Sequence, residues 1–443
     1  MKLTDFPKIL IPVYKMDIPN EIIILQEGDY IIKWKDRTFI SKGFLFFQWI
    51  PRLSVRFKGK LGDDFSYSWW SLLEDDIGIE ISLPQYNFYS KGIIYKLREF
   101  EDFNIVCQLP PEIILGDTSK VTDIVRFEIS NLKGIYGSPV RTEKSGHRSR
   151  LTFTNSESEI IIDKSPDFIK LKPKLVEVGG YHLLYTGQLK LHNNKKLTYQ
   201  KSQDILDSFS YYLLFINGRR CFPLFPTGYN NDQKEWALYS PAFNDPYKGV
   251  ISWASDEPNN GIEIMWNNFS EIWENIDDRD SLKTILHWYT ESNSNSAFIE
   301  GSIVLLQNAL ELLFHWVIVE KFKYVNQNEA ESLSATSKIN FLLSHFSIRN
   351  EIPSDFDALI KYAKQNNIVN GPESFTRIRN HIVHPSSKKR KALKEIETNA
   401  KIEALHLGIW YVEMILLKLF EFKGNYINRC SVLKHKNKYE KIE

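Results

Sequence analysis

Cysteine is scarce in this chain of 443 residues, and the three that occur, Cys107, Cys221 and Cys430, are far apart. Their spacing forms neither a paired zinc pattern nor a disulfide framework, which argues for a protein of the reducing cytoplasm. The sequence also lacks a glycine-rich phosphate-binding loop, so an ATP-driven enzyme is not expected. We predict a protein that needs no metal and no cofactor.

The sequence has no long uninterrupted hydrophobic run. The segment Met1–Asp5 leads into no apolar stretch of the kind that a signal peptide requires. The most apolar segments, Phe298–Val319 and Ile402–Phe420, are interrupted by Glu, Asn, His or Lys. These segments predict buried helices, and no association with a membrane is expected.

Charge of one sign is not in excess overall, since the formal net charge is only +1. Its distribution is uneven. Residues 301–443 hold 21 Lys and Arg against 15 Asp and Glu, whereas residues 1–300 hold 35 against 40. A basic C-terminal third is what a protein that meets polyphosphate would show, although a difference of this size also arises by ordinary scatter.

Residues 1–265 contain many short apolar or alternating runs bounded by Gly, Pro, Asn and Asp. This pattern predicts a β-rich, sandwich-like N-terminal region of antiparallel sheets, with a possible subdivision near residue 170. One helix is expected at Ser202–Leu214, with Ser202 as its N-cap. The proline-containing tract Phe222–Asn244 is expected to be a loop anchored by Trp236 and Trp253.

The composition changes after Trp266, where helical periodicity begins and continues to the C-terminus. Residues 266–443 therefore predict an all-α bundle, which makes the chain an α+β multidomain protein. A polar loop is expected at Asn326–Ser337. The expected helices are Ser270–Asp277, Asp280–Glu291, Phe298–Tyr324, Lys338–His345, Ser354–Asn366, Glu373–His384 and Lys401–Phe422.

The densest polar chemistry lies in the segment from Arg377 to Pro385, RIRNHIVHP. On a helical wheel Phe375, Ile378 and Ile382 form a core-facing stripe, whereas Asn380 and His384 face away from it. Arg379 lies nearer the stripe, and its long stem would carry the guanidinium outward. An Arg and a His at this spacing suit phosphate stabilisation and proton transfer near neutral pH, although a merely solvated helix face has the same pattern.

The pattern Arg379-Asn380-x-x-x-His384 resembles the R-x4-H signature of HEPN domains. The wider C-terminal stretch is similar to the HEPN domain of ApeA-like antiphage proteins, and a weaker similarity covers part of their β-rich N-terminal region. The residues that carry the resemblance are Lys338–Leu343, Ile352-Pro353, Leu359, Phe375–Pro385 and Gly424–Arg429, together with Phe47–Pro51 and Val55–Gly59.

The resemblance implies a metal-independent endoribonuclease that acts as a homodimer through its HEPN domain. His384 would be the general acid and base, Arg379 would stabilise charge on the phosphate, and Asn380 would position either group. RNA would be cut to 2′,3′-cyclic phosphate and 5′-OH ends, in antiphage defence by abortive infection. The β-rich region would gate the nuclease until a phage-derived protein trigger binds to it.

Further basic residues lie within the motif and on both sides of it, and they could hold the RNA backbone. For the cluster that follows the motif, a solvated helix start explains the residues about as well. These candidate RNA-binding residues are Arg377, His381, Lys388, Lys389 and Arg390.

Glu311, on the long apolar helix of the bundle, is a candidate orienting acid for the Arg379 guanidinium. The resemblance supports this assignment, because HEPN domains often carry an acidic residue on the corresponding helix. A buried structural ion pair would account for Glu311 equally well.

Two other functions compete with the nuclease. The helical domain could be a non-catalytic dimerisation module attached to a β-rich ligand-binding domain. Alternatively, Trp69, Trp70 and nearby carboxylates could belong to a carbohydrate enzyme or binder, which would need a carboxylate pair at a set distance. The basic segment Arg141–Arg150 could bind an anion or nucleic acid, but a solvated hairpin tip is the simpler prediction. The acidic run Glu74–Asp76 could ligate a divalent cation, but a solvated turn is the simpler prediction.

Overall fold

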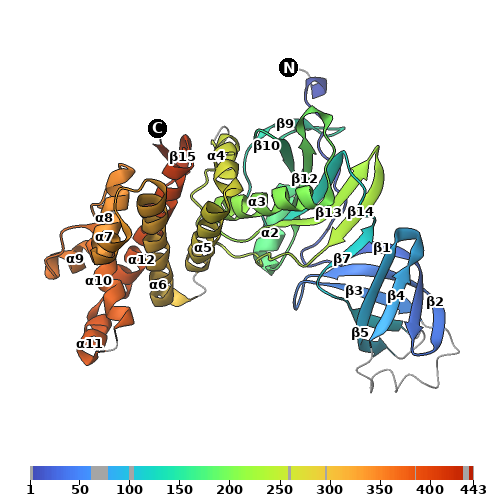
Figure 1. Cartoon of the computed structure of the whole chain (residues 1–443), viewed down its shortest axis with the longest axis horizontal. Coiled ribbons are helices and arrows are strands. Elements are labelled where there is room, and N and C mark those ends of the chain that lie inside the picture. The colour runs from blue at the N-terminus through green and yellow to red at the C-terminus, as the bar shows by residue number, and fades with distance from the viewer. Residues whose placement is uncertain are drawn as a thin grey trace. The chain divides into compact units, whose positions relative to one another are not determined.

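The computed structural model describes residues 3–60, 78–98, 104–257, 261–294, 297–384, 386–432 and 439–442 (Figure 1). The chain divides into two units. The N-terminal unit holds Met1–Thr152, Ser156–Ser210 and Cys221–Lys248, and the C-terminal unit holds Phe153–Asn155, Tyr211–Arg220 and Gly249–Glu443. The predicted fold class is confirmed, because a β-rich N-terminal region precedes a mainly helical C-terminal region.

The first six strands form a closed antiparallel barrel in the order β1-β2-β3-β6-β5-β4. Alternate side chains enter its core, as in β4, where Ile79, Ile81 and Leu83 are buried. Closure depends on the pairing of β1 with β4, in which Ile31 lies opposite Ser82. The strands are β1 (Ile23–Trp34), β2 (Arg37–Gln48), β3 (Ser54–Lys60), β4 (Ile79–Leu83), β5 (Phe88–Arg98) and β6 (Asn104–Gln108).

The remaining strands of this unit form an eight-stranded sheet in the order β7-β14-β13-β8-β12-β11-β10-β9. The described β-rich region is therefore a barrel and a large antiparallel sheet. The strands are β7 (Ile113–Gly116), β8 (Ile124–Ser130), β9 (Ser138–Arg141), β10 (Gly146–Thr154), β11 (Ser158–Lys164), β12 (Leu183–Leu191), β13 (Pro223–Asn230) and β14 (Gln233–Tyr239).

The expected loop at Phe222–Asn244 is wrong, because β13 and β14 form a hairpin there. Its prolines occupy the two places that a central strand tolerates. Pro223 is the first residue of β13, and Pro226 lies where the pairing of β13 with β8 shifts register. Trp236, predicted to anchor a loop, is instead a fully buried residue of β14, and Trp253, the other predicted anchor, is fully buried as well.

Two α-helices accompany the sheet: α2 (Phe168–Val178) and α3 (Tyr199–Asn217). The helix predicted at Ser202–Leu214 is confirmed, but Ser202 is not its N-cap. Thr198 has that role, since its hydroxyl accepts a hydrogen bond from the Lys201 amide at 3.2 Å. Ser202 instead donates to the Tyr199 carbonyl inside the first turn.

The C-terminal unit is a helical bundle that ends in a two-stranded sheet. Its helices are α4 (Ile262–Glu274), α5 (Ile276–Asn293), α6 (Phe298–Leu313), α7 (Gln327–Ser332), α8 (Ala335–His345), α9 (Asp357–Gln365), α10 (Gly371–Val383), α11 (Ser387–Glu395), α12 (Thr398–Leu419) and α13 (Arg429–Val432). A π-helix at Phe314–Lys321 continues α6, and the strands are β15 (Gly424–Ile427) and β16 (Tyr439–Ile442).

The loop expected at Asn326–Ser337 is also wrong, because it contains α7 and the start of α8. Both helices begin at caps. Asn326 and Glu329 form a capping box, and Ser334 accepts a hydrogen bond from the Ser337 amide.

The stretch Phe298–Lys321 is long and apolar enough to cross a membrane by length and composition alone. Of the described helices it is the one that meets this criterion, and 67% of its apolar window is buried inside the protein. The core helix of a bundle has the same properties.

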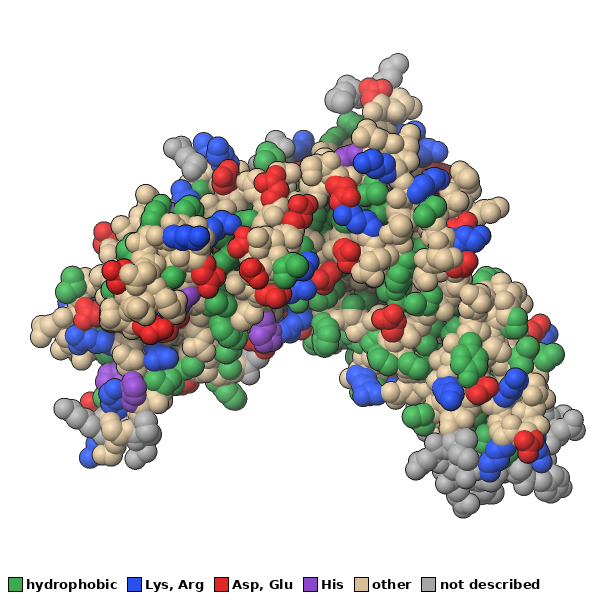
Figure 2. All heavy atoms as spheres, in the orientation of Figure 1, with side chains coloured by type: hydrophobic (Ala, Val, Ile, Leu, Met, Phe, Trp, Pro, Cys, Tyr) green, Lys and Arg blue, Asp and Glu red, His purple; other side chains and the backbone are tan. Residues whose placement is uncertain are grey.

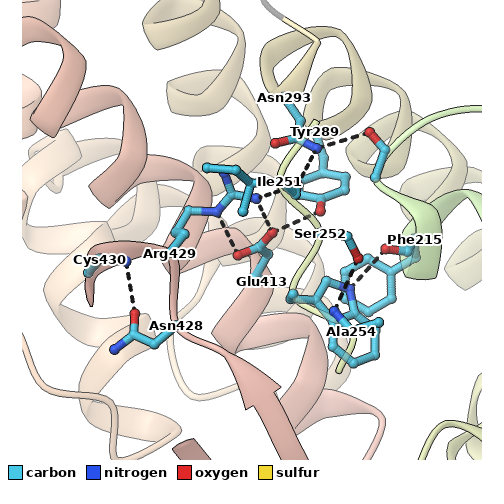
Figure 3. A network of polar contacts seen from close by, with 12 residues as sticks. Phe215, Ile251, Ser252, Ala254, Tyr289, Asn293, Glu413, Asn428, Arg429 and Cys430 are labelled. Atoms are coloured by element: carbon cyan, nitrogen blue, oxygen red, sulfur yellow. Dashed lines mark hydrogen bonds and ion pairs between the residues drawn. The ribbon is translucent and has the colours of Figure 1, made fainter. Parts of the chain in front are cut away.

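A buried polar network fastens the end of the chain to the bundle (Figure 3). Arg429 of α13 forms two hydrogen bonds with Glu413 of α12, which also accepts one from the Tyr289 hydroxyl at 2.8 Å. Arg429 donates further to the carbonyl of Ile251, and Asn293 donates to the same carbonyl. Polar groups this deeply buried are stable only when partners satisfy them, and this network joins α5, α12 and α13.

Candidate functional site

Helix α10 carries Arg379 and Asn380 and ends just before His384. It begins at Asn370, whose side chain accepts a hydrogen bond from the Glu373 amide at 3.0 Å. Pro372 occupies the first turn, where its missing amide donor costs nothing. Phe375 and Ile378 are fully buried and fix the rotation of the helix in the bundle.

Helix α8 runs antiparallel to α10. The hydroxyl oxygens of Thr336 and Thr376 lie 2.6 Å apart, while Asn370 at the start of α10 donates to Asn340 further along α8. The N-terminal end of α8 therefore lies beside the middle of α10.

Helices α6 and α12 run in the same direction as each other. Lys401 pairs with Glu300 at 3.2 Å near their starts, and further along Gly408 lies against Leu306 and Phe375. Helix α10 runs opposite to α12, because its first residue, Gly371, lies against Tyr411 and its later residue Phe375 against Gly408. The short helix α11 accordingly links the end of α10 to the start of α12 (Figure 1).

The N-terminal ends of α6 and α12 thus lie at the end of the bundle where α10 stops, whereas α8 begins beside the middle of α10. Each helix start carries partial positive charge from backbone N–H groups that lack a partner within the helix. The C-terminal end of α10 contributes the opposite partial charge. This environment suits a phosphate group held beside an imidazole.

Arg379 and Asn380 are half-buried side chains at this end. The Arg379 Nη1 atom donates to Asn380 Oδ1 at 3.4 Å. Its Nε is buried without a hydrogen-bond partner, and no salt bridge with a carboxylate is found for it among the described residues. The structure therefore brings Arg379 and Asn380 together and leaves the buried Nε–H donor of the guanidinium without a partner.

His384 differs from the prediction in one respect. The expected helix Glu373–His384 placed it on the last turn, whereas α10 ends at Val383 and His384 has extended backbone angles of φ −97° and ψ 120°. A residue before proline disfavours helical geometry, which explains the early end. The side chain is exposed, and within the described ranges no hydrogen bond or ion pair engages it.

His381 and the start of α11 lie close to one another. Burial, followed by the positive charges of Lys389 and Arg377, lowers the pKa of His381 and favours its neutral form. Figure 2 shows histidine side chains gathered with basic ones where α10 meets α11. Lys388 and Arg390 lie on α11, but their side chains are outside the described part of the chain.

Arg377 is already engaged within the bundle. It pairs with Glu373 at 2.7 Å and donates to the carbonyl of Asn366 at 3.1 Å. Its guanidinium closes the contact between α9 and α10, and only its remaining donors are available to RNA.

Glu311 is not brought to Arg379. Its carboxylate accepts a hydrogen bond from Gln307 at 2.8 Å, one turn earlier on α6. Gly408 lies against both Leu306 of α6 and Phe375 of α10, so these two residues lie at the same height in the bundle. Because α6 and α10 are antiparallel, Glu311 and Arg379 lie on opposite sides of that height, about 13 Å apart along the helix axes. The predicted orienting contact is therefore not made.

The other candidates fall elsewhere. Arg141–Arg150 forms the predicted hairpin between β9 and β10. Trp69, Trp70 and Glu74–Asp76 lie outside the described residues. Sequence reasoning missed Gly408, where the absent Cβ lets Phe375 approach α12. An isolated glycine inside a helical pattern is the signal for such close packing.

The fold and the site define a multidomain α+β protein whose C-terminal bundle presents an arginine and a histidine at one end. Residues 117–250 match the YopA central domain, and residues 275–440 match the YopA C-terminal domain. The chain belongs to the YopA family.

The SPbeta prophage-derived protein YopA of Bacillus subtilis (strain 168) is 25% identical over 421 residues, which span 93% of each chain. No solved structure matches the chain. None of these matches names the HEPN or ApeA class, so that finer resemblance stays a prediction.

Proposed function

We propose that this protein is a metal-independent endoribonuclease of the HEPN class. The observation that carries the proposal is the placement of Arg379, Asn380 and His384 at one end of the bundle, beside the starts of α6 and α12. Arg379 has unpartnered donors there, and His384 is open to solvent. A structural role would be expected to pair both groups inside the protein.

In the proposed reaction the RNA 2′-OH attacks the adjacent phosphorus. A bond forms between O2′ and phosphorus as the bond from phosphorus to O5′ breaks, leaving a 2′,3′-cyclic phosphate and a 5′-OH. One imidazole removes the 2′-OH proton and one delivers a proton to O5′. Arg379 stabilises the charge on the phosphoryl oxygens, and Asn380 positions the guanidinium.

The need for both a base and an acid supports a homodimer. One protomer supplies a single His384 at this end of the bundle, whereas two α10 ends facing one another would supply two imidazoles and two guanidinium groups. The half-buried His381 does not replace the second imidazole, because its lowered pKa disfavours the protonated form that an acid requires.

The wider setting is part of the same proposal. The relative from Bacillus subtilis is described as prophage-derived, which fits a protein that acts in phage infection of bacteria. We propose that the nuclease acts in the cytoplasm in abortive infection, and that the N-terminal unit gates it until a phage-derived protein binds. RNA, a second copy of the chain and that trigger would be its partners.

End-labelled single-stranded RNA incubated with the full chain in EDTA tests the proposal. The wild type and the control His287→Ala, a change at an exposed histidine of α5, should cleave RNA to cyclic phosphate ends. Arg379→Ala and His384→Ala should not, and single-stranded DNA should stay intact because it lacks the 2′-OH. Cleavage that EDTA abolishes, or cleavage that survives both substitutions, would overturn the mechanism.

If the N-terminal unit keeps the purified nuclease inactive, a second experiment in cells is needed. Growth arrest on overexpression that disappears in His384→Ala but persists in His287→Ala would support the nuclease when the purified chain is silent. Equal growth with all three proteins, together with no cleavage in vitro, would favour the non-catalytic dimerisation module attached to a ligand-binding domain.

A further inference from the structure

A pocket of about 520 Å³ opens in the N-terminal unit. Its walls are the segment at residues 9–17, one face of α2, and strand β12 at residues 183–186. This volume falls in the range of small-molecule sites. All of its lining belongs to one unit and to the described part of the chain.

Two buried carboxylates build the wall of the pocket. Asp163 accepts a hydrogen bond from the Leu10 amide at 2.7 Å and is paired with Arg150. Glu128 accepts from the Val13 amide at 2.7 Å and from the Thr186 hydroxyl at 2.8 Å. Both carboxyl groups are therefore occupied in fastening the N-terminal segment to the sheet, and neither is left to hold a ligand.

Most of the remaining apolar side chains are aliphatic, and Tyr14 and Tyr185 also line the pocket. The aliphatic side chains complement a flexible hydrocarbon chain, and the two tyrosine hydroxyl groups already have hydrogen-bond partners in the protein. Ile11 also lines the pocket and is 77% exposed, so apolar surface is left uncovered there. The aliphatic side chains are Ile9, Leu10, Met16, Leu171, Leu183 and Leu184.

Lysine side chains surround this apolar surface. Lys170 and Lys174 lie one turn apart on α2, on the same helix face, and Lys15 lies on the opposite wall. Lys170 is paired with Asp167 in an exposed contact. Lys15 and Lys174 are exposed, and no ion pair engages either of them among the described residues. The lining holds as many carboxylates as lysines, but Asp163, Glu128 and Asp167 are engaged within the protein, which leaves Lys15 and Lys174 opposite Asp17 alone.

We propose that this pocket binds an amphipathic anion, an aliphatic chain that ends in a carboxylate or phosphate group. The chain would lie on the aliphatic lining, and the head group would meet Lys15 and Lys174 at the mouth. A free fatty acid and a single-chain phospholipid share this chemistry. The inference does not depend on the proposed nuclease.

Isothermal titration of the full chain tests the pocket with three probes kept below their micelle concentrations: dodecanoate, dodecyl phosphate and dodecyltrimethylammonium. One anionic probe or both should bind at one site per chain, and the cationic probe should bind at least about tenfold more weakly. The tighter of the two anions identifies the head group and hence the source of the natural ligand.

Variants locate the binding. The double change Lys15→Glu/Lys174→Glu should weaken anion binding by about tenfold or more, and Leu171→Asp should weaken it by a similar factor. Lys195→Glu, at an exposed lysine of the same unit outside the pocket, should change nothing. A midpoint of thermal unfolding equal to that of the wild type would show that the lysine variants fold.

Four results would overturn the proposal, three of which concern the twelve-carbon probes. They are equal affinity for the cationic probe, unchanged affinity in the lysine double variant, and failure of both anions to bind. Binding of acetate or inorganic phosphate as tight as that of the twelve-carbon anions would also contradict it, since the aliphatic lining would then contribute nothing.

Discussion

Arg429 and Glu413 form a two-point ion pair that solvent does not reach. The Nε of Arg429 donates to Oε2 of Glu413 at 2.8 Å, and Nη2 donates to Oε1 at 2.5 Å. Their side chains are 1% and 0% exposed. The pair fixes α13 on α12, and the Tyr289 hydroxyl adds α5 to the same contact.

The first prediction concerns this pair. Arg429→Met should lower the free energy of unfolding of the C-terminal unit by about 3 to 5 kcal/mol, because it leaves the Glu413 carboxylate buried without its partner. The double variant Arg429→Met/Glu413→Leu should recover most of the loss. Denaturant unfolding of the full chain measures both. A single variant within about 1 kcal/mol of the wild type would show that the pair is not closed to water.

The second prediction is a loss of stability in acid through His406. Burial, with a smaller contribution from the charge of Arg429, lowers the pKa of His406 to about 4. Between pH 6.5 and pH 4, His406 is therefore protonated in the unfolded chain but stays neutral in the folded chain. The free energy of unfolding falls as the pH drops through this range. This contribution reaches at most about 3 kcal/mol.

His406→Gln removes the titrating group and should flatten this part of the profile. Free energies of unfolding at pH 7 and pH 4.5 provide the measurement. The same pH dependence in the variant and the wild type would assign the acid sensitivity to other groups.

The third prediction uses the close approach at Gly408. A Cβ there would lie 2.5 Å from Cε2 of Phe375, so Gly408→Ala should force α10 away from α12. We expect a destabilisation of about 1 to 3 kcal/mol and a loss of RNA cleavage, because Arg379 moves with the helix. Gly249→Ala is the matched control, since nothing lies within 4 Å of its Cβ position. Full cleavage by a destabilised Gly408→Ala protein would show that RNA cleavage does not depend on the packing of α10 against α12.

The fourth prediction concerns Asn380, which accepts a hydrogen bond from Arg379 at 3.4 Å. Asn380→Ala should reduce the cleavage rate by about tenfold or more, the effect of one hydrogen bond to a charged group. Asn380→Gln, which keeps the amide, should restore part of the rate. Single-turnover kinetics distinguish this positioning role from RNA binding, because only a binding role would raise the RNA concentration needed for half-maximal rate.

The sequence predicted the fold class because hydrophobic periodicity is local. The alternation of strands and the 3.6-residue period of α10 and α12 are both visible within a short window. The closed barrel was not predictable in this way, since closure depends on Ile31 meeting Ser82 across some fifty residues. The β13–β14 hairpin was missed because its prolines resemble loop punctuation, and only the register shift beside Pro226 shows why β13 tolerates them.

In the candidate site, too, local patterns predicted the residues of one helix but not the contacts between helices. Arg379 and Asn380 follow from one helix and its wheel, so sequence reasoning placed them correctly on α10. Glu311 depends on the relative direction of α6 and α10, which no local pattern encodes. The position of the starts of α6 and α12 beside the end of α10 is likewise a property of the packed bundle.

The extended backbone at His384 gives the two principal groups of the candidate site different kinds of support. Arg379 is held by a packed helix, whereas the imidazole of His384 is attached to the link that joins α10 to the basic helix α11. A rotation of that link would reorient the histidine while leaving the arginine in place. A polyanion that binds to α11 would therefore also change the distance between the side chains of Arg379 and His384.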